Sequence, residues 1–278
     1  MAYLSEMDVD SGFVDPEGAA KRGVELCERY NSAEPFPHIV IDDFLPEEVL
    51  ERCLREFPLD LSEGGVRFDR EQERFKTHFT PDVLSPWYRS LFYGFNSRPF
   101  IRVLENITGI KGLIPDPFFL GAGLHEIAQG GHLSVHADFN HHKPMNLERR
   151  INLLIYLNKD WMLEYGGGLE LWDLSMKHKV VDVAPIFNRC VIFNTTSNSF
   201  HGNPEVINHP NGVSRKSIAL YYYTSTWDSS KRDHTTQFKM RSGSDDSFDF
   251  RVKCRELMQD ILPPILYRKW NAKKIDRD

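Results

Sequence analysis

The hydrophobic pattern of the first third of the chain is typical of helices with a short strand among them. Apolar residues recur at three- and four-residue intervals, as they do on the buried face of a helix. The pattern predicts helices at residues 16–30 and 45–57 and a pair of helices within 84–107. A short strand is expected at 37–44, where β-branched residues are dense. Residues 60–82 are polar and rich in turn-forming residues, so we expect turns there.

From residue 118 to residue 227 the pattern changes to short apolar runs separated by Gly, Asn and Pro. The strands expected there lie at 120–127, 133–138, 151–157, 169–174, 179–183, 191–194 and 216–224. Many short strands without helices between them predict a jelly roll or a similar antiparallel barrel. Beyond this region, a loop is expected at 229–247 and a helix at 248–262, which ends before Pro263 and Pro264.

The fold class predicted from these elements is mainly β with flanking helices, around a cupin-like jelly-roll core. The length of 278 residues allows about two domains, or one large β domain with attachments. We expect a single domain over residues 1–278. It comprises an N-terminal extension at 1–34, helices and the jelly roll at 35–228, and a C-terminal loop and helix at 229–278.

Composition excludes several classes of protein. Hydrophobic residues make up 41% of the chain and charged residues 27%, as in an ordinary soluble protein. The net charge of −6 gives no support for a nucleic-acid partner. No stretch approaches the ~18 apolar residues of a membrane span, and the first residues do not resemble a signal peptide. A cytoplasmic location is therefore expected, and four scattered cysteines without a CxxC pair agree with a reducing compartment.

Candidate metal ligands follow one predicted strand. Side chains alternate across a strand, so His136 and Asp138 point to the same face and lie close enough to bind one ion. His201 is the best candidate for a third ligand. Two histidines and a carboxylate on one side of an ion form the facial triad of non-haem Fe(II) oxygenases. Taken alone, His136 and Asp138 also fit a structural hydrogen bond between the two side chains.

A second candidate is the arginine that begins the strand at 215–224. Arg215 shares a face with Ser217 and Ala219, whose small side chains leave room for a long cation to reach into a barrel. A guanidinium binds a carboxylate through two parallel hydrogen bonds, so Arg215 is a plausible anchor for a dicarboxylate cosubstrate, with Ser217 beside it. A surface arginine at the start of a strand is the alternative.

Together these residues resemble a known family. The order His136-Ala-Asp138, then His201, then Arg215 is similar to that of the Fe(II)- and 2-oxoglutarate-dependent dioxygenases of the prolyl 4-hydroxylase type. The resemblance extends over residues 118–224, and more loosely over 36–54. It implies a double-stranded β-helix that binds Fe(II) through His136, Asp138 and His201. It also implies 2-oxoglutarate and O2 as cosubstrates, and hydroxylation of an unactivated C–H with release of succinate and CO2.

The resemblance implies further roles for individual residues. Tyr156 matches the position from which relatives often present a hydroxyl to the distal carboxylate of 2-oxoglutarate, and His125 is expected to play a similar part. The presence of Asp138 implies oxygenation, since halogenating relatives lack this carboxylate. We further expect Asn152, Trp172 and His132 to line the substrate site.

The substrate class stays open at this stage. The compact size favours a small molecule or an amino acid, with a prolyl or other side chain of a protein or peptide as the alternative. Two other functions remain to be separated from hydroxylation. One is a cupin-like isomerase or a dioxygenase that needs no cosubstrate, and the other is a non-enzymatic jelly-roll module that binds or senses metal.

Overall fold

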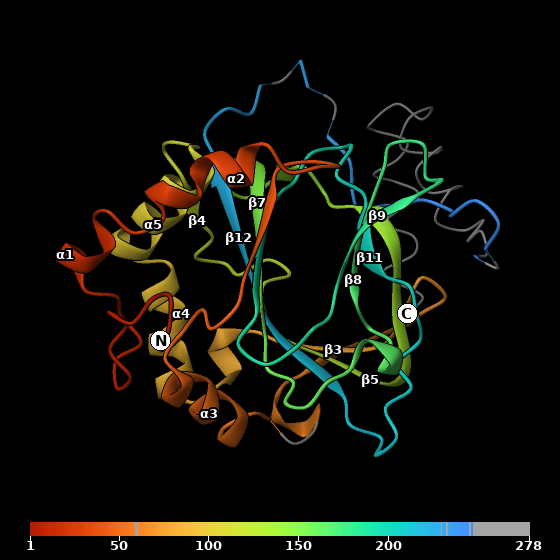
Figure 1. Cartoon of the computed structure of the whole chain (residues 1–278), viewed down its shortest axis with the longest axis horizontal. Coiled ribbons are helices and arrows are strands. Elements are labelled where there is room, and N and C mark those ends of the chain that lie inside the picture. Colours follow the sequence, from red (N-terminus) through yellow and green to blue (C-terminus); the bar gives the residue numbers. More distant parts are fainter. Residues whose placement is uncertain (59–60, 229, 232, 245, 247–278) are drawn as a thin grey trace, which may run out of the picture. The chain divides into compact units, whose positions relative to one another are not determined.

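The computed structural model describes residues 1–58, 61–228, 230–231, 233–244 and 246. The helix expected at 248–262 lies outside the described residues. One compact unit spans Met1–Gly243, and its elements appear in Figure 1. Its α-helices are α1 (Pro16–Ala19), α2 (Cys27–Asn31), α3 (Glu47–Arg55), α4 (Pro86–Phe95) and α5 (Arg98–Thr108). Its 3₁₀ turns are η1 (Val24–Leu26), η2 (Leu61–Glu63), η3 (Pro81–Val83) and η4 (Leu163–Tyr165).

The helices of the first third are confirmed except at 16–30. The single helix expected there is instead α1, η1 and α2, because Gly23 between them adopts φ +96°, which a right-handed helix does not allow. The helix expected at 45–57 is α3. The pair within 84–107 is α4 and α5, each of which begins with proline in its first turn, where a missing N–H costs nothing.

Thirteen strands of the described residues join into one antiparallel sheet. The strands are β1 (His38–Ile41), β2 (Val66–Arg70), β3 (Glu73–Phe79), β4 (Ile114–Pro115), β5 (Gly123–Ala137), β6 (His141–His142), β7 (Leu147–Tyr156), β8 (Leu169–Trp172), β9 (Lys179–Val183), β10 (Cys190–Asn194), β11 (His201–Asn203), β12 (Arg215–Thr224) and β13 (Gln237–Phe238). Their main order is β1-β10-β7-β12-β5-β11-β8-β9. This arrangement confirms the predicted jelly roll, with β5 shared by both layers of the barrel.

Three predictions about the strands were wrong. The strands expected at 120–127 and 133–138 are the two halves of the single strand β5. Its first half pairs with β12 and its second with β11, so one long strand passes from one layer to the other. The turns expected at 60–82 include the hairpin β2–β3, which extends the sheet beyond β5. The loop expected at 229–247 contains β13, which pairs with β5.

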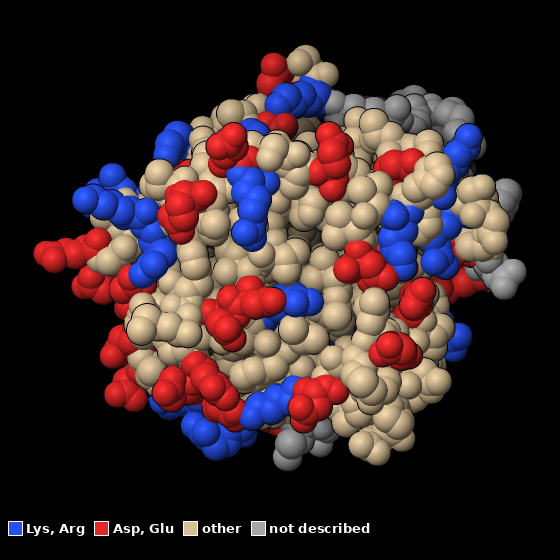
Figure 2. All heavy atoms as spheres, viewed as in Figure 1, with Lys and Arg blue, Asp and Glu red and all other residues tan. Residues whose placement is uncertain are grey.

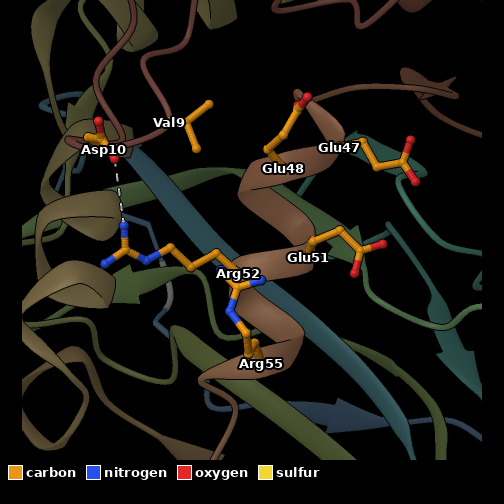
Figure 3. A pocket seen from close by; sticks show the side chains of 7 residues that line it. All are labelled: Val9, Asp10, Glu47, Glu48, Glu51, Arg52 and Arg55. Atoms are coloured by element: carbon orange, nitrogen blue, oxygen red, sulfur yellow. Dashed lines mark ion pairs between the residues drawn. The ribbon is translucent and has the colours of Figure 1, made fainter.

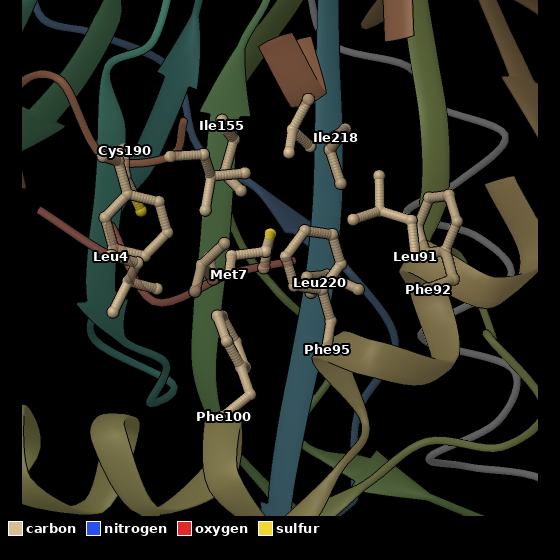
Figure 4. Close-up of a cluster of buried hydrophobic side chains, with 14 of the residues drawn as sticks. Leu4, Met7, Leu91, Phe92, Phe95, Phe100, Ile155, Cys190, Ile218 and Leu220 are labelled. Carbon is tan, nitrogen blue, oxygen red and sulfur yellow. The ribbon is translucent and has the colours of Figure 1, made fainter. Parts of the chain in front are cut away.

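The part of the sheet formed by β7, β12 and β5 carries different side chains on its two faces. On β12, Ile218 and Leu220 point to the face covered by the helices, where they join the main hydrophobic core (Figure 4). Arg215 and Ser217 alternate with them and point into the barrel. Lys216, on the helix side, pairs at 3.1 Å with Glu126, which lies directly opposite it on β5. The strand register expected from the sequence is therefore confirmed, and the same sheet supports the core on one face and the site on the other.

Charged side chains of both signs are interspersed on the surface in Figure 2. That face shows no broad basic patch, in agreement with the net charge of −6. Among the helices of the described residues, none has the length and apolar character that a membrane crossing requires.

The packing of the helices on the sheet yields a stability prediction. Leu220 is 1% exposed within the main core, so Leu220→Ala should lower the free energy of unfolding by ~2–5 kcal/mol through lost burial and the cavity left behind. Leu174, which is 66% exposed, serves as the matched control, and Leu174→Ala should change it by less than ~0.5 kcal/mol. Urea denaturation followed by circular dichroism measures both. Equal effects of the two substitutions would contradict this packing.

Candidate active site

The structure brings His136, Asp138 and His201 together in the barrel. His201 begins β11 and lies directly opposite His136 of β5. His136 Nε2 is 3.6 Å from Asp138 Oδ1, and His201 Nε2 is 3.4 Å from Asp138 Oδ2. The three ligand atoms lie within 4.8 Å of one another, which suits a single ion. The sequence pattern placed Asp138 within the strand, whereas in the structure it follows the end of β5.

Both histidines are held with one nitrogen free for a metal. The Nδ1 atoms of His136 and His201 each lie 2.9 Å from the carbonyl oxygen two residues earlier, that of Ser134 and of Ser199. A Nδ1–H that donates to a carbonyl leaves the Nε2 lone pair for coordination. Burial lowers the pKa of His201 to about 4, so its ring is neutral near pH 7, as a metal ligand must be. The donor set therefore fits a divalent transition metal such as Fe(II).

Asp138 is fixed by two neighbours on β7. Arg149 Nη2 pairs with Asp138 Oδ2 at 2.9 Å, and Asn152 Nδ2 donates to the same oxygen at 3.2 Å. Burial disfavours the charged carboxylate, but Arg149 and the two histidines outweigh it and hold the pKa of Asp138 well below its usual range. Asp138 is therefore ionised and oriented before any metal binds.

The sequence analysis missed Arg149. Its guanidinium is 1% exposed and lies against two aromatic rings, 4.5 Å from the centroid of Phe139 and 3.6 Å from that of Tyr221. Simple alternation would place Arg149 and Asn152 on opposite faces of the strand. A β-bulge between β7 and β12 changes the register at Arg149 and brings both side chains to Asp138. The signal present in the sequence was a pair of arginines, Arg149 and Arg150, directly before the apolar run of β7.

The residues expected to bind the cosubstrate share one face of three neighbouring strands. Ser217 of β12 lies opposite Tyr156 of β7 on one side and His125 of β5 on the other. Directly opposite residues of an antiparallel pair point to the same face. Arg215 reaches the same region, with its guanidinium carbon 4.8 Å from the centroid of the Tyr156 ring. The structure thus groups these four residues on one wall of the barrel.

Arg215 and Tyr156 have unused binding capacity. Arg215 is 4% exposed, and its Nε donates to the carbonyl of Gly167 at 2.8 Å instead of to any carboxylate of the described residues. The Tyr156 hydroxyl is buried beside it, and no described residue forms a well-shaped hydrogen bond with it. A buried cation next to an unsatisfied hydroxyl matches what the distal carboxylate of 2-oxoglutarate needs. The residues present therefore fit this cosubstrate.

The turn before β8 packs closely against the Arg215 side chain. Gly167 adopts φ +72°, and a Cβ built there would lie 2.9 Å from Arg215 Cδ. Only glycine combines that backbone conformation with this close approach to the arginine stem.

His125 has a more limited part, because its Nε2 is 2.9 Å from the carbonyl of Gly121. Burial holds the pKa of His125 well below its ordinary value, so its neutral ring forms part of the wall.

The three residues expected to line the substrate site are placed differently from one another. Asn152 contacts Asp138 directly, so one end of its amide supports a metal ligand. Trp172 lies away from the triad, in a separate cluster with Val135 and Phe200. Leu171 pairs with His201, and its neighbour Trp172 points to the other face of the strand. His132 directs its Nε2 to the carbonyl of Glu71 in the β2–β3 turn, 3.1 Å away. The structure therefore brings only Asn152 to the triad.

A separate surface hollow of about 460 Å³ lies along α3 (Figure 3). Its lining residues come from α3 and the N-terminal segment: Val9, Asp10, Glu47, Glu48, Glu51, Arg52 and Arg55. None of the triad or cosubstrate residues borders it. The chemistry of the chain is therefore placed in the barrel and not in this hollow.

Comparison with known proteins agrees with the geometry. Residues 122–223 match the family model described as the 2OG-Fe(II) oxygenase superfamily. The chain is also 35% identical over 199 residues to the Mus musculus protein named prolyl 3-hydroxylase OGFOD1. That match covers 68% of this chain and 33% of the relative, so the chain spans about a third of that relative's length.

Two solved structures share the fold at low sequence identity. A prolyl 4-hydroxylase structure from Phytophthora capsici is 20% identical with a TM-score of 0.50, covering 76% of this chain and 66% of that chain. The α-ketoglutarate-dependent carbocyclase SnoK from nogalamycin biosynthesis is 12% identical with a TM-score of 0.50, covering 87% of this chain and 93% of that chain. At such identities the likeness concerns the fold alone.

The geometry of the triad predicts one metal site. Titration of the apo-protein with Mn(II) under nitrogen should show one ion bound. His201→Ala should weaken its affinity by more than about 100-fold, because losing even an outer contact of a metal ligand costs 10–100-fold. His132→Ala is the matched control, since the triad does not include this histidine. Calorimetry and the metal-dependent rise in Tm measure the effect. If His201→Ala bound Mn(II) like the wild type, the third ligand would be wrongly assigned.

The opposite orientations of Arg215 and Lys216 yield a second prediction. Breaking a buried ion pair costs ~3–5 kcal/mol, so Arg215→Ala should weaken 2-oxoglutarate binding by about two to three orders of magnitude. Lys216 lies on the other face and pairs with Glu126 near solvent, so Lys216→Ala should change it by less than roughly tenfold. Anaerobic titration of the Fe(II) protein with 2-oxoglutarate, followed by its visible absorption, measures both. The reverse ranking would contradict the assigned strand register.

Proposed function

We propose that this chain, which belongs to the 2OG-Fe(II) oxygenase superfamily, hydroxylates the ring of a prolyl residue in a peptide or protein. The chain is a dioxygenase of that superfamily and uses Fe(II) and 2-oxoglutarate. The observation that carries the choice of substrate is the 35% identity to a protein named as a prolyl 3-hydroxylase. This choice replaces the small molecule that the compact size of the chain favoured.

The proposed ligands of Fe(II) are His136, Asp138 and His201, and Arg215 with Tyr156 would hold the distal carboxylate of 2-oxoglutarate. When bound, the metal and cosubstrate supply the oxidising power, and O2 and 2-oxoglutarate are converted to succinate, CO2 and one hydroxyl group on the substrate. His136, Asp138 and His201 would hold such an ion from one side, which would leave room for the cosubstrate and oxygen.

The chain itself supplies orientation and a dry environment. The Nδ1 contacts fix both histidine rings, and Arg149 with Asn152 fixes the carboxylate of Asp138. Phe193 is fully buried, and its ring centroid lies 4.6 Å from that of His201. Water is thereby excluded from the inner side of the site, which protects a reactive centre from side reactions.

Two polar atoms beside the triad support a peptide substrate. Among the described residues, Arg149 Nε and Asn152 Oδ1 are buried without a hydrogen-bond partner, and both belong to side chains that contact Asp138. Buried polar groups without a partner are rare in folded proteins and call for a ligand or water. One atom is a donor and the other an acceptor, which is the pair of groups that a peptide backbone satisfies.

The following experiment tests whether the substrate is a peptide or a small molecule. Enzyme loaded with Fe(II) and 2-oxoglutarate is given either blocked heptapeptides with a central proline and random flanks, or free L-proline. We expect some peptides to gain one oxygen atom by mass spectrometry and to yield hydroxyproline after acid hydrolysis, with matching succinate. His201→Ala should form neither product. Hydroxylation of free proline alone, or of neither probe, would contradict the proposed function.

A further inference from the structure

We propose that Phe238 is a specificity-determining residue, whose ring forms the outer wall of the substrate site and packs against the prolyl ring. The inference rests on the proposed function and names one recognition element of that same site. Phe238 belongs to β13, in a part of the chain where the sequence predicted only a loop.

The register of β13 places Phe238 beside the metal ligands. Phe238 lies directly opposite His136 in the antiparallel pair with β5. Directly opposite side chains share a face, so the Phe238 ring points to the same side as the His136 imidazole. The two ring centroids are 5.4 Å apart, with 44° between their planes. The phenyl group therefore borders the proposed iron site without ligating it.

The two histidines have aromatic neighbours of different kinds. Phe193, beside His201, is fully buried among the apolar side chains of the barrel interior. Phe238, beside His136, is only half-buried. An apolar ring that keeps part of its surface exposed next to a catalytic centre can gain burial when a substrate arrives. Phe193 thus belongs to the barrel core, whereas Phe238 is available to a ligand.

The segment that carries Phe238 is attached to the barrel at several points. We call the described residues of 225–240 the strap. Trp227 stacks on His141 with ring centroids 4.0 Å apart and 9° between the planes. His234 Nε2 lies 2.8 Å from the Ser197 hydroxyl, and Lys239 N–H donates to the carbonyl of Val135 at 2.9 Å. These attachments fix the position of Phe238, and a fixed ring loses little entropy on binding.

A phenyl ring suits the proposed substrate. The prolyl ring is apolar and rigid, and its C–H groups carry the slight positive charge that the face of an aromatic ring attracts. Arg149 and Asn152 have the unsatisfied donor and acceptor that a peptide backbone needs. Phe238 would then recognise the ring while those atoms recognise the backbone.

The test compares four forms of the enzyme on the heptapeptides with central proline. Phe238→Ala should raise the KM of the peptides by about tenfold, a typical contribution of an aromatic contact, while kcat changes by less than about threefold. Phe238→Tyr should restore the wild-type KM because it keeps the ring. Gln237→Ala is the matched control: Gln237 lies on the same short strand opposite Ala137, which packs in the cluster on the other face.

Peptide binding is measured separately from turnover. The labelled heptapeptides are added to enzyme loaded with Mn(II) and 2-oxoglutarate without oxygen, and their anisotropy is followed. Phe238→Ala should weaken this binding by a similar factor and leave the affinity for Mn(II) unchanged. An unchanged KM and an unchanged peptide affinity in Phe238→Ala would overturn the inference and leave the proposed function intact. If the wild type hydroxylates no peptide, the proposed function fails and this inference with it.

Discussion

The buried ionised carboxylate of Asp138 is the constraint on which the arrangement of the site depends. A charge removed from water must be compensated by opposite charge and hydrogen bonds, or it is lost by protonation. Arg149 and Asn152 of β7 provide that compensation, and Tyr221 of β12 covers the guanidinium from the other side. Two strands, β7 and β12, therefore contribute side chains that orient this one carboxylate. Because the carboxylate is charged and fixed in advance, a metal ion can bind without reorganisation of the site.

Strand alternation explains how one sheet serves both stability and chemistry. Along β12, Ile218 and Leu220 face the helices and are buried in the main core, while Arg215 and Ser217 face the barrel. A slip of one residue would turn Ile218 into the barrel and place Arg215 under the helices. The main core therefore does more than stabilise the fold, because its preference for Ile218 and Leu220 fixes the register that aims Arg215.

The parts of the site that follow local rules could be predicted from the sequence. His136 and Asp138 lie two residues apart, and the face of Arg215 follows from alternation within its own strand. What could not be predicted depends on pairing between distant strands. The bulge that turns Arg149 toward Asp138 is visible only once β7 is paired with β12. The position of Phe238 likewise depends on β13 meeting β5. Trp172 was expected at the substrate site but lies away from the triad for the same reason, since its face is set by the pairing of β8 with β11.

The two buried arginines of the barrel show how unsatisfied groups carry functional information. Arg149 has its carboxylate within the chain, in Asp138, so its charge is explained by the fold itself. Arg215 is equally enclosed, but among the described residues no carboxylate pairs with it: its Nε donates to the carbonyl of Gly167, and the Tyr156 hydroxyl beside it lacks a well-formed hydrogen bond. An apolar side chain of similar size would fill the same space at a lower desolvation cost. A fold that keeps an uncompensated cation there gives up stability, and such a sacrifice is expected where the missing anion arrives as a ligand. Among the described residues, the surroundings of Arg215 are thus distinguished by the anion that they lack, and the triad by the ligand atoms that it provides.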